Sequence, residues 1–212
     1  MNPTLSPMRQ KLIGSLLFLL LVVLGTILIW QRFGEQSPSR QEPPRNEGPE
    51  GTILPVFGQA PDFSLTERSG RAFSKSDLTG KPWIADFIFT SCAGQCPLMS
   101  LEMRRLQRLF QKEIGLRFVS FTVDPERDTP EVLSQYADRY DAEKNRWFFL
   151  TGPQGEMNRI LNGFFLSPVD QPAMHSIRFI LVDGEDQMRG YYDSSDAAAI
   201  KQLVHDVRIL IK

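Results

Sequence analysis

Short apolar runs alternate with amphipathic stretches from about residue 52 to the end of the 212-residue chain. The clearest apolar run covers residues 83–89 and is almost continuous, which is typical of a strand buried on both faces of a sheet. Directly after it, residues 97–113 carry apolar side chains at a period of 3.6 residues, which predicts an amphipathic helix. A chain that alternates strands and helices in this way is expected to fold into an α/β domain.

The rest of the pattern extends this alternation. A turn signal at residues 68–70 predicts a hairpin over residues 63–73. One later helix opens on Thr129-Pro130-Glu131 with Asp128 or Thr129 as its N-cap, and the last opens on Ser194 or Ser195. The order mixes βαβ units with hairpins and predicts a three-layer α/β/α domain with a mixed sheet. Further strands are expected at 116–123, 146–150, 177–182 and 187–192, and further helices at 153–165 and 195–211.

An uncharged segment precedes this domain. Residues 12–30, from Leu12 to Trp30, are about as long as the roughly 20 residues that a helix needs to cross a bilayer. A cleaved signal peptide is the alternative, but its apolar region is shorter and ends in small residues. We therefore expect an uncleaved transmembrane anchor. Arg9 and Lys11 favour a cytoplasmic N-terminus, which places the rest of the chain on the extracytoplasmic side of the inner membrane.

Composition divides the chain further. Residues 31–51 are rich in Pro, Glu, Arg, Gln and Ser, which is typical of a flexible linker. Residues 52–212 have the usual length of one domain. The expected organisation is a cytoplasmic tail at 1–11, an anchor at 12–30, a linker at 31–51 and a folded domain at 52–212. The net charge of −1 shows no basic excess and excludes a nucleic-acid-binding protein.

The two cysteines, Cys92 and Cys96, lie where the strand at 83–89 gives way to a helix. The positive end of a helix dipole lowers the pKa of a thiol and makes it a better nucleophile and metal ligand. Residues four apart lie on one face of a helical turn, so both sulfurs can point the same way. The pair can therefore hold one metal ion or form a redox-active disulfide. A purely structural disulfide is less favoured, because closing so short a loop stabilises a fold little.

A third ligand is expected from one of two histidines. His205 lies among charged residues of the last predicted helix and is interpreted as solvated. His175 follows a turn-like segment and precedes the strand at 177–182, which makes it the candidate ligand. Two thiolates and one imidazole suit copper, particularly Cu(I), and also zinc. Three protein ligands argue against a structural zinc site, which usually has four.

Three segments together resemble the Sco/SenC family of membrane-tethered, thioredoxin-like copper proteins. They are residues 89–97 with the Cys-x-x-x-Cys-Pro motif, residues 122–133 (TVDPERDTPEVL), and His175-Ser176 before a strand that ends in Asp183-Gly184. The resemblance runs from about Phe57 to the C-terminus. It implies a copper site, for Cu(I) and also Cu(II), formed by Cys92, Cys96 and His175. The implied function is delivery of copper to, or reduction of thiols in, the binuclear copper centre of cytochrome c oxidase.

The chain departs from the family pattern at two places. Ala93-Gly94-Gln95 stand where relatives usually carry a proline and an acidic residue, and Met174 stands where they usually have aspartate. Asp124 lies in the family's conserved segment and is expected either to orient the loop near the site or only to form a turn. The alternative functions are an extracytoplasmic thiol–disulfide oxidoreductase or redox sensor, with Cys92 attacking and Cys96 as its partner, and a peroxidase-like enzyme.

Overall fold

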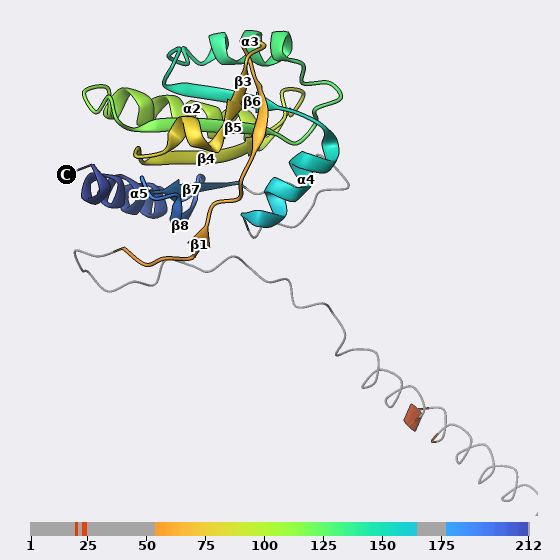
Figure 1. Cartoon of the computed structure of the whole chain (residues 1–212). Helices are drawn as coiled ribbons and strands as arrows, with labels where there is room; N and C mark the ends of the chain where they lie inside the picture. The colour runs from red at the N-terminus through yellow and green to blue at the C-terminus, as the bar shows by residue number, and fades with distance from the viewer. Residues whose placement is uncertain (1–19, 21–22, 25–53, 165–176, 212) are drawn as a thin grey trace, which may run out of the picture. The chain divides into compact units, whose positions relative to one another are not determined.

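The computed structural model describes residues 20, 23–24, 54–164 and 177–211 (Figure 1). Apart from residues 20, 23 and 24, the expected anchor at 12–30 lies outside this part of the chain, and so does the linker at 31–51. His175 and Met174 also lie outside it, within residues 165–176. No helix within the described ranges has both the length and the apolar character required to cross a bilayer.

The described residues form one mixed sheet of eight strands in the order β1-β8-β7-β4-β5-β6-β2-β3. The central strands β4, β5 and β6 run parallel to one another, and the remaining neighbours are antiparallel. Two βαβ units and two hairpins are therefore combined, which confirms the predicted mixed sheet. The strands are β1 (Gly58–Gln59), β2 (Ser64–Glu67), β3 (Ala72–Ser74), β4 (Trp83–Ile88), β5 (Arg117–Thr122), β6 (Trp147–Thr151), β7 (Arg178–Val182) and β8 (Gln187–Asp193).

The helices connect these strands in the expected order. They are the short 3₁₀ helix η1 (Lys75–Leu78) and the α-helices α2 (Gln95–Leu109), α3 (Pro130–Arg139), α4 (Gln154–Gly163) and α5 (Ala197–Leu210). Helix α2 begins two residues before the predicted start and ends four residues before the predicted end. The chain leaves the helix at Phe110 and turns so that Leu116 leads into β5. Residues 110–113 continue the apolar and polar pattern but lie in this turn.

The core is built around the two faces of β4. All six of its residues are buried, as the nearly continuous apolar run predicts. The ring of Phe87 stacks on Phe121 at a centroid distance of 5.3 Å and meets Phe164 edge-on at 5.6 Å. A strand buried on both faces requires covering chain on each side of the sheet, so β4 is held rigidly at the centre of the domain.

Helix capping confirms one prediction and corrects another. Thr129 caps α3, because its side chain accepts a hydrogen bond from the Val132 N–H at 3.4 Å. The prediction that Ser194 or Ser195 caps α5 is wrong. The cap is Asp196, whose carboxylate accepts from the Ala198 N–H at 2.8 Å.

Replacing Gly163 with alanine is expected to destabilise the domain by about 1–3 kcal/mol. A Cβ on Gly163, the last residue of α4, would lie 2.6 Å from Cβ of Pro61, and the proline ring cannot move aside as a flexible side chain would. Gly155 in the same helix is the matched control, because a Cβ there meets no atom within 4 Å among the described residues. Chemical denaturation of both variants measures the difference. Equal stabilities would show that Pro61 yields to the added methyl group.

Candidate thiol and metal site

The loop after β4 brings both cysteines to the start of α2. Cys92 is half-buried, and its N–H donates to the Phe89 carbonyl at 3.2 Å, which turns the chain away from the sheet. Cys96 is the second residue of α2 and is fully buried. No disulfide joins the two sulfurs. The structure thus places the predicted pair at the carboxyl end of a central parallel strand.

The sulfur of Cys92 occupies the place of a capping side chain. The N-cap of α2 is Gly94, which has no side chain to cap the helix. Instead, the Gly94 N–H donates to Sγ of Cys92 at 3.4 Å, and the backbone N–H groups of Gln95 and Cys96 donate to the same sulfur. The first N–H groups of a helix lack partners within the helix and carry its partial positive charge. They therefore favour a thiolate at Cys92.

The two thiols differ in acidity as a result. Burial alone would raise the pKa of Cys92, but the hydrogen bonds from the three backbone N–H groups and from the Cys96 side chain outweigh it, so the pKa is lowered. Burial raises the pKa of Cys96 far above its ordinary value, and the neighbouring Cys92 raises it further. Cys92 is therefore the sulfur that ionises first, while Cys96 keeps its proton and donates it in a hydrogen bond to Cys92.

The spacer between the cysteines leaves this sulfur open to a partner. Ala93, Gly94 and Gln95 are all exposed. A Cβ on Gly94 would lie 4.0 Å from Sγ of Cys92, in ordinary van der Waals contact, so any larger side chain would extend next to the sulfur. Glycine at this position keeps the surroundings of Cys92 accessible.

A buried carboxylate behind this loop joins it to the loop that follows β5. Asp128 is fully buried and accepts from the Thr90 hydroxyl at 2.5 Å and from the Thr90 N–H at 3.1 Å. It also accepts from the hydroxyl of Thr122, the last residue of β5, at 2.5 Å. Because Thr90 is two residues before Cys92, this carboxylate fixes the chain that leads into the site.

The structure shows how Asp124 is used. Its carbonyl accepts from the N–H groups of Arg127 and Asp128, at 3.1 and 2.9 Å, and its carboxylate pairs with the Arg127 guanidinium at 3.1 Å. Asp124 therefore forms the turn after β5, as one of the two expectations held. The residue that reaches the cysteine loop is Asp128, which the sequence suggested only as a helix cap. No sequence pattern marked this contact, because Thr90 and Thr122 approach each other only in the folded sheet, where the parallel register places Thr122 opposite Ile88.

The third predicted ligand remains a prediction, because His175 lies outside the described residues. Among the residues that are described, no three Cys, His, Asp or Glu side chains come close enough to hold a metal ion together. The second histidine, His205, is exposed on α5, in agreement with its interpretation as a solvated residue. Two of the three predicted ligands, Cys92 and Cys96, are therefore brought together by the fold.

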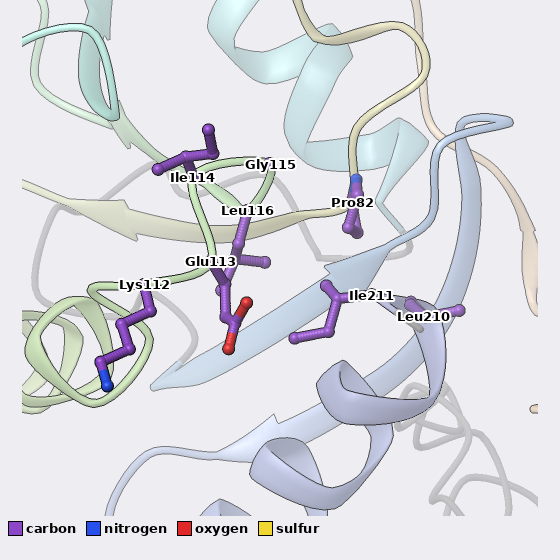
Figure 2. A pocket seen from close by; sticks show the side chains of 8 residues that line it. All are labelled: Pro82, Lys112, Glu113, Ile114, Gly115, Leu116, Leu210 and Ile211. Carbon is purple, nitrogen blue, oxygen red and sulfur yellow. The ribbon is translucent and has the colours of Figure 1, made fainter.

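A pocket of about 340 Å³ lies elsewhere on the domain (Figure 2). It includes Pro82 and Leu116, which immediately precede β4 and β5, whereas Cys92 follows the other end of β4. The pocket is therefore separated from the thiols by the length of the parallel strands and does not belong to their site. Its lining is completed by Lys112, Glu113, Ile114, Gly115, Leu210 and Ile211.

Two cysteines, four residues apart at the start of the first crossover helix of a mixed sheet, define a thioredoxin-like thiol protein. The chain belongs to the SCO1/SenC family, whose model matches residues 57–212. The SCO1 protein homolog of Bacillus subtilis is 32% identical over 161 residues, which cover 73% of this chain and 83% of that protein.

Two solved structures share the fold. BsSco, described as a member of the Sco family of cytochrome c oxidase assembly proteins with a disulfide switch, is 30% identical with a TM-score of 0.68, covering 76% of this chain and 98% of that one. Yeast Sco1 with copper bound is 26% identical with a TM-score of 0.55, covering 71% of this chain and 89% of that one. The family thus includes a structure with copper and one with a disulfide switch.

Proposed function

We propose that this protein binds copper at Cys92, Cys96 and His175 and delivers it to the binuclear copper centre of cytochrome c oxidase. The observation that carries the proposal is the thiol pair at the N-terminus of α2 in a chain of the SCO1/SenC family. Yeast Sco1, a relative with the same fold, has been solved with copper bound. Copper is the cargo of this protein rather than the agent of a reaction.

The donor set fits a soft metal ion. The sulfurs are close enough for Cys96 to hydrogen-bond to Cys92, and thiolates favour Cu(I). Cys92 supplies the first thiolate, because the helix N–H groups already stabilise its negative charge. Cys96 supplies the second when it gives up the proton that burial retains. His175 would add an imidazole, a ligand that also suits Cu(II).

The membrane and the partner complete the proposal. Residues 12–30 anchor the protein in the inner membrane with a cytoplasmic N-terminus, and residues 31–51 tether the domain on the extracytoplasmic side. The recipient is the copper-bearing subunit of cytochrome c oxidase or another protein that accepts copper or thiol electrons. BsSco, which shares the fold, is described as a member of a family of oxidase assembly proteins.

The unequal acidity of the cysteines supports a second candidate, a thiol–disulfide oxidoreductase or redox sensor. A Cys92 thiolate would attack a partner's disulfide and release one partner thiolate, giving a mixed disulfide. Cys96, after losing its proton, would attack Cys92 and release the partner's second thiolate. The Cys92–Cys96 pair ends oxidised by two electrons, and the partner ends as a dithiol. The same pair serves both functions, since only its reduced form can bind copper.

Titration of the reduced full-length chain with Cu(I), in detergent and against a competing chelator, is expected to give one tightly bound ion per chain. The same chain with Cys92 and Cys96 oxidised to a disulfide is the matched control and should bind none at this site, because its sulfurs are no longer thiolates. Equal binding by both forms, or none by either, would contradict the copper proposal. Catalytic reduction of a model disulfide by a chain that binds no copper would favour the oxidoreductase.

A further inference from the structure

A hydrogen-bonded bridge holds the cysteine loop in place from behind. At its centre, the Asp128 carboxylate accepts from the hydroxyl and the N–H of Thr90 on one side and from the hydroxyl of Thr122 on the other. Thr122 in turn accepts from the Asp124 N–H at 3.0 Å. The bridge spans 38 residues of sequence, and Asp128 and Thr122 are both fully buried. We refer to Thr90, Thr122 and Asp128 as the Asp128 bridge.

The bridge acts on the segment that positions the Cys92 sulfur. After β4 ends at Ile88, the backbone N–H of Thr90 donates to the Asp128 carboxylate. The next backbone contact is from the Cys92 N–H to the Phe89 carbonyl. The Cys92 sulfur then accepts hydrogen bonds from N–H groups of α2. Whether it reaches them depends on the backbone path of residues 89–92.

We propose that Asp128 is a positioning residue for the thiol site, acting through Thr90 to hold Cys92 at the N-terminus of α2. The carboxylate acts through Thr90 rather than on a sulfur, and it preorganises one ligand. Hydrogen bonds to a charged carboxylate are stronger than those between neutral groups, so two of them to Thr90 and one to Thr122 hold the loop against the end of β5. Where copper binding is concerned, this inference rests on the proposed function.

The test uses a conservative pair at Thr90. Thr90→Val removes the hydroxyl but keeps the shape, whereas Thr90→Ser keeps the hydroxyl. Asp128→Asn removes the charge and presents an amide. The first readout is the rate at which iodoacetamide alkylates Cys92 in the reduced, metal-free full-length chain, assigned by mass spectrometry. The second is the Cu(I) affinity, and the third is stability to denaturant.

Thr90→Val and Asp128→Asn are each expected to slow alkylation of Cys92 about fivefold. They should lower copper affinity about tenfold or more, as outer-shell substitutions do at metal sites. Thr90→Ser should stay within about twofold of the parent in both. Parent-like behaviour of Thr90→Val overturns the proposal, and so does equal loss in Thr90→Ser. If Asp128→Asn does not fold, the Thr90 pair decides alone.

The two functional readouts separate this inference from the proposed function. A parent chain that binds no copper refutes the copper proposal. In that case, slow alkylation of Cys92 in Thr90→Val, restored in Thr90→Ser, still supports the positioning function. The positioning function is overturned by a different result. In that result, copper affinity falls only in step with stability to denaturant, and the alkylation rate of the folded chain is unchanged.

Discussion

Replacing His175 with alanine is expected to lower the affinity for Cu(II) by at least about 100-fold, and the affinity for Cu(I) by less. The loss of a ligand should exceed the 10–100-fold cost typical of substituting a residue behind a ligand. Cu(I) is the less sensitive ion because two soft thiolates from Cys92 and Cys96 satisfy it well, whereas Cu(II) favours further nitrogen or oxygen ligands. Competition with chelators selective for each oxidation state measures both affinities.

The chain offers its own control for this experiment. His205 is the second histidine, and it is exposed on α5. His205→Ala removes the same group and is expected to leave both affinities unchanged. If His175→Ala binds Cu(II) as tightly as the parent, the three-ligand site is wrong and the thiol pair must act alone or with another ligand.

Replacing Asp86 with asparagine is expected to stabilise the domain at pH 8 by about 2–4 kcal/mol. Asp86 is fully buried in β4, and neither carboxyl oxygen makes a hydrogen bond within the described part of the chain. Burial raises the pKa of Asp86 to about 7, and the Ser120 hydroxyl, which lies opposite it on β5 but outside hydrogen-bond geometry, only partly offsets this effect. Between about pH 4 and pH 7 the folded state thus holds a proton that the unfolded chain has already released, and above pH 7 the folded state carries a buried charge.

The pH dependence gives this prediction its sign. Below about pH 4, both the folded and unfolded states carry the proton, so ionisation of Asp86 does not lower the free energy of unfolding. Between about pH 4 and pH 7 only the unfolded state ionises, so the stability due to this group falls as the pH rises. Above pH 7 the cost is constant. Denaturation of the parent and Asp86→Asn from pH 4 to pH 8 should therefore show curves that diverge with increasing pH.

Asp206 provides the contrast. It is also buried, but its carboxylate accepts from the Tyr192 hydroxyl at 2.7 Å and from the Gln202 amide at 2.8 Å. Asp206→Asn should therefore destabilise the domain, because the asparagine amide places a donor against existing donors. An equal effect of the two substitutions, or a pH-independent effect at Asp86, would show that the Asp86 carboxylate has a partner.

The sequence predicted the helices and strands that are determined by the residues within them. The apolar run at 83–89 became β4, and the Thr129-Pro130 signal marked the start of α3. The elements that the sequence did not reveal depend on distant contacts. Strand β1 has only two residues, and its pairing with β8 is set by backbone bonds such as Phe57 N–H to the Met188 carbonyl at 2.8 Å. No local pattern encodes such a pairing.

The same division holds at the site. The Cys-x-x-x-Cys spacing and its position before a helix were sufficient to predict that both thiols lie at the start of α2. Cys92 was predicted as the attacking thiol, in agreement with its lowered pKa, but the raised pKa of Cys96 was not predictable, because it depends on the burial of that sulfur in the folded domain. The Asp128 bridge was likewise hidden, since Thr90, Thr122 and Asp128 meet only when β4 and β5 pair in parallel.

The exposed spacer at residues 93–95 has a consequence for how such proteins diversify. These three residues lie on the surface beside a reactive sulfur, while the core beneath them is built from β4 and its neighbours. Substitutions here alter the charge and crowding around Cys92 with little cost to folding. Substitutions in this short surface segment are therefore expected to change the metal preference or redox behaviour of the thiol pair while leaving the scaffold beneath it intact.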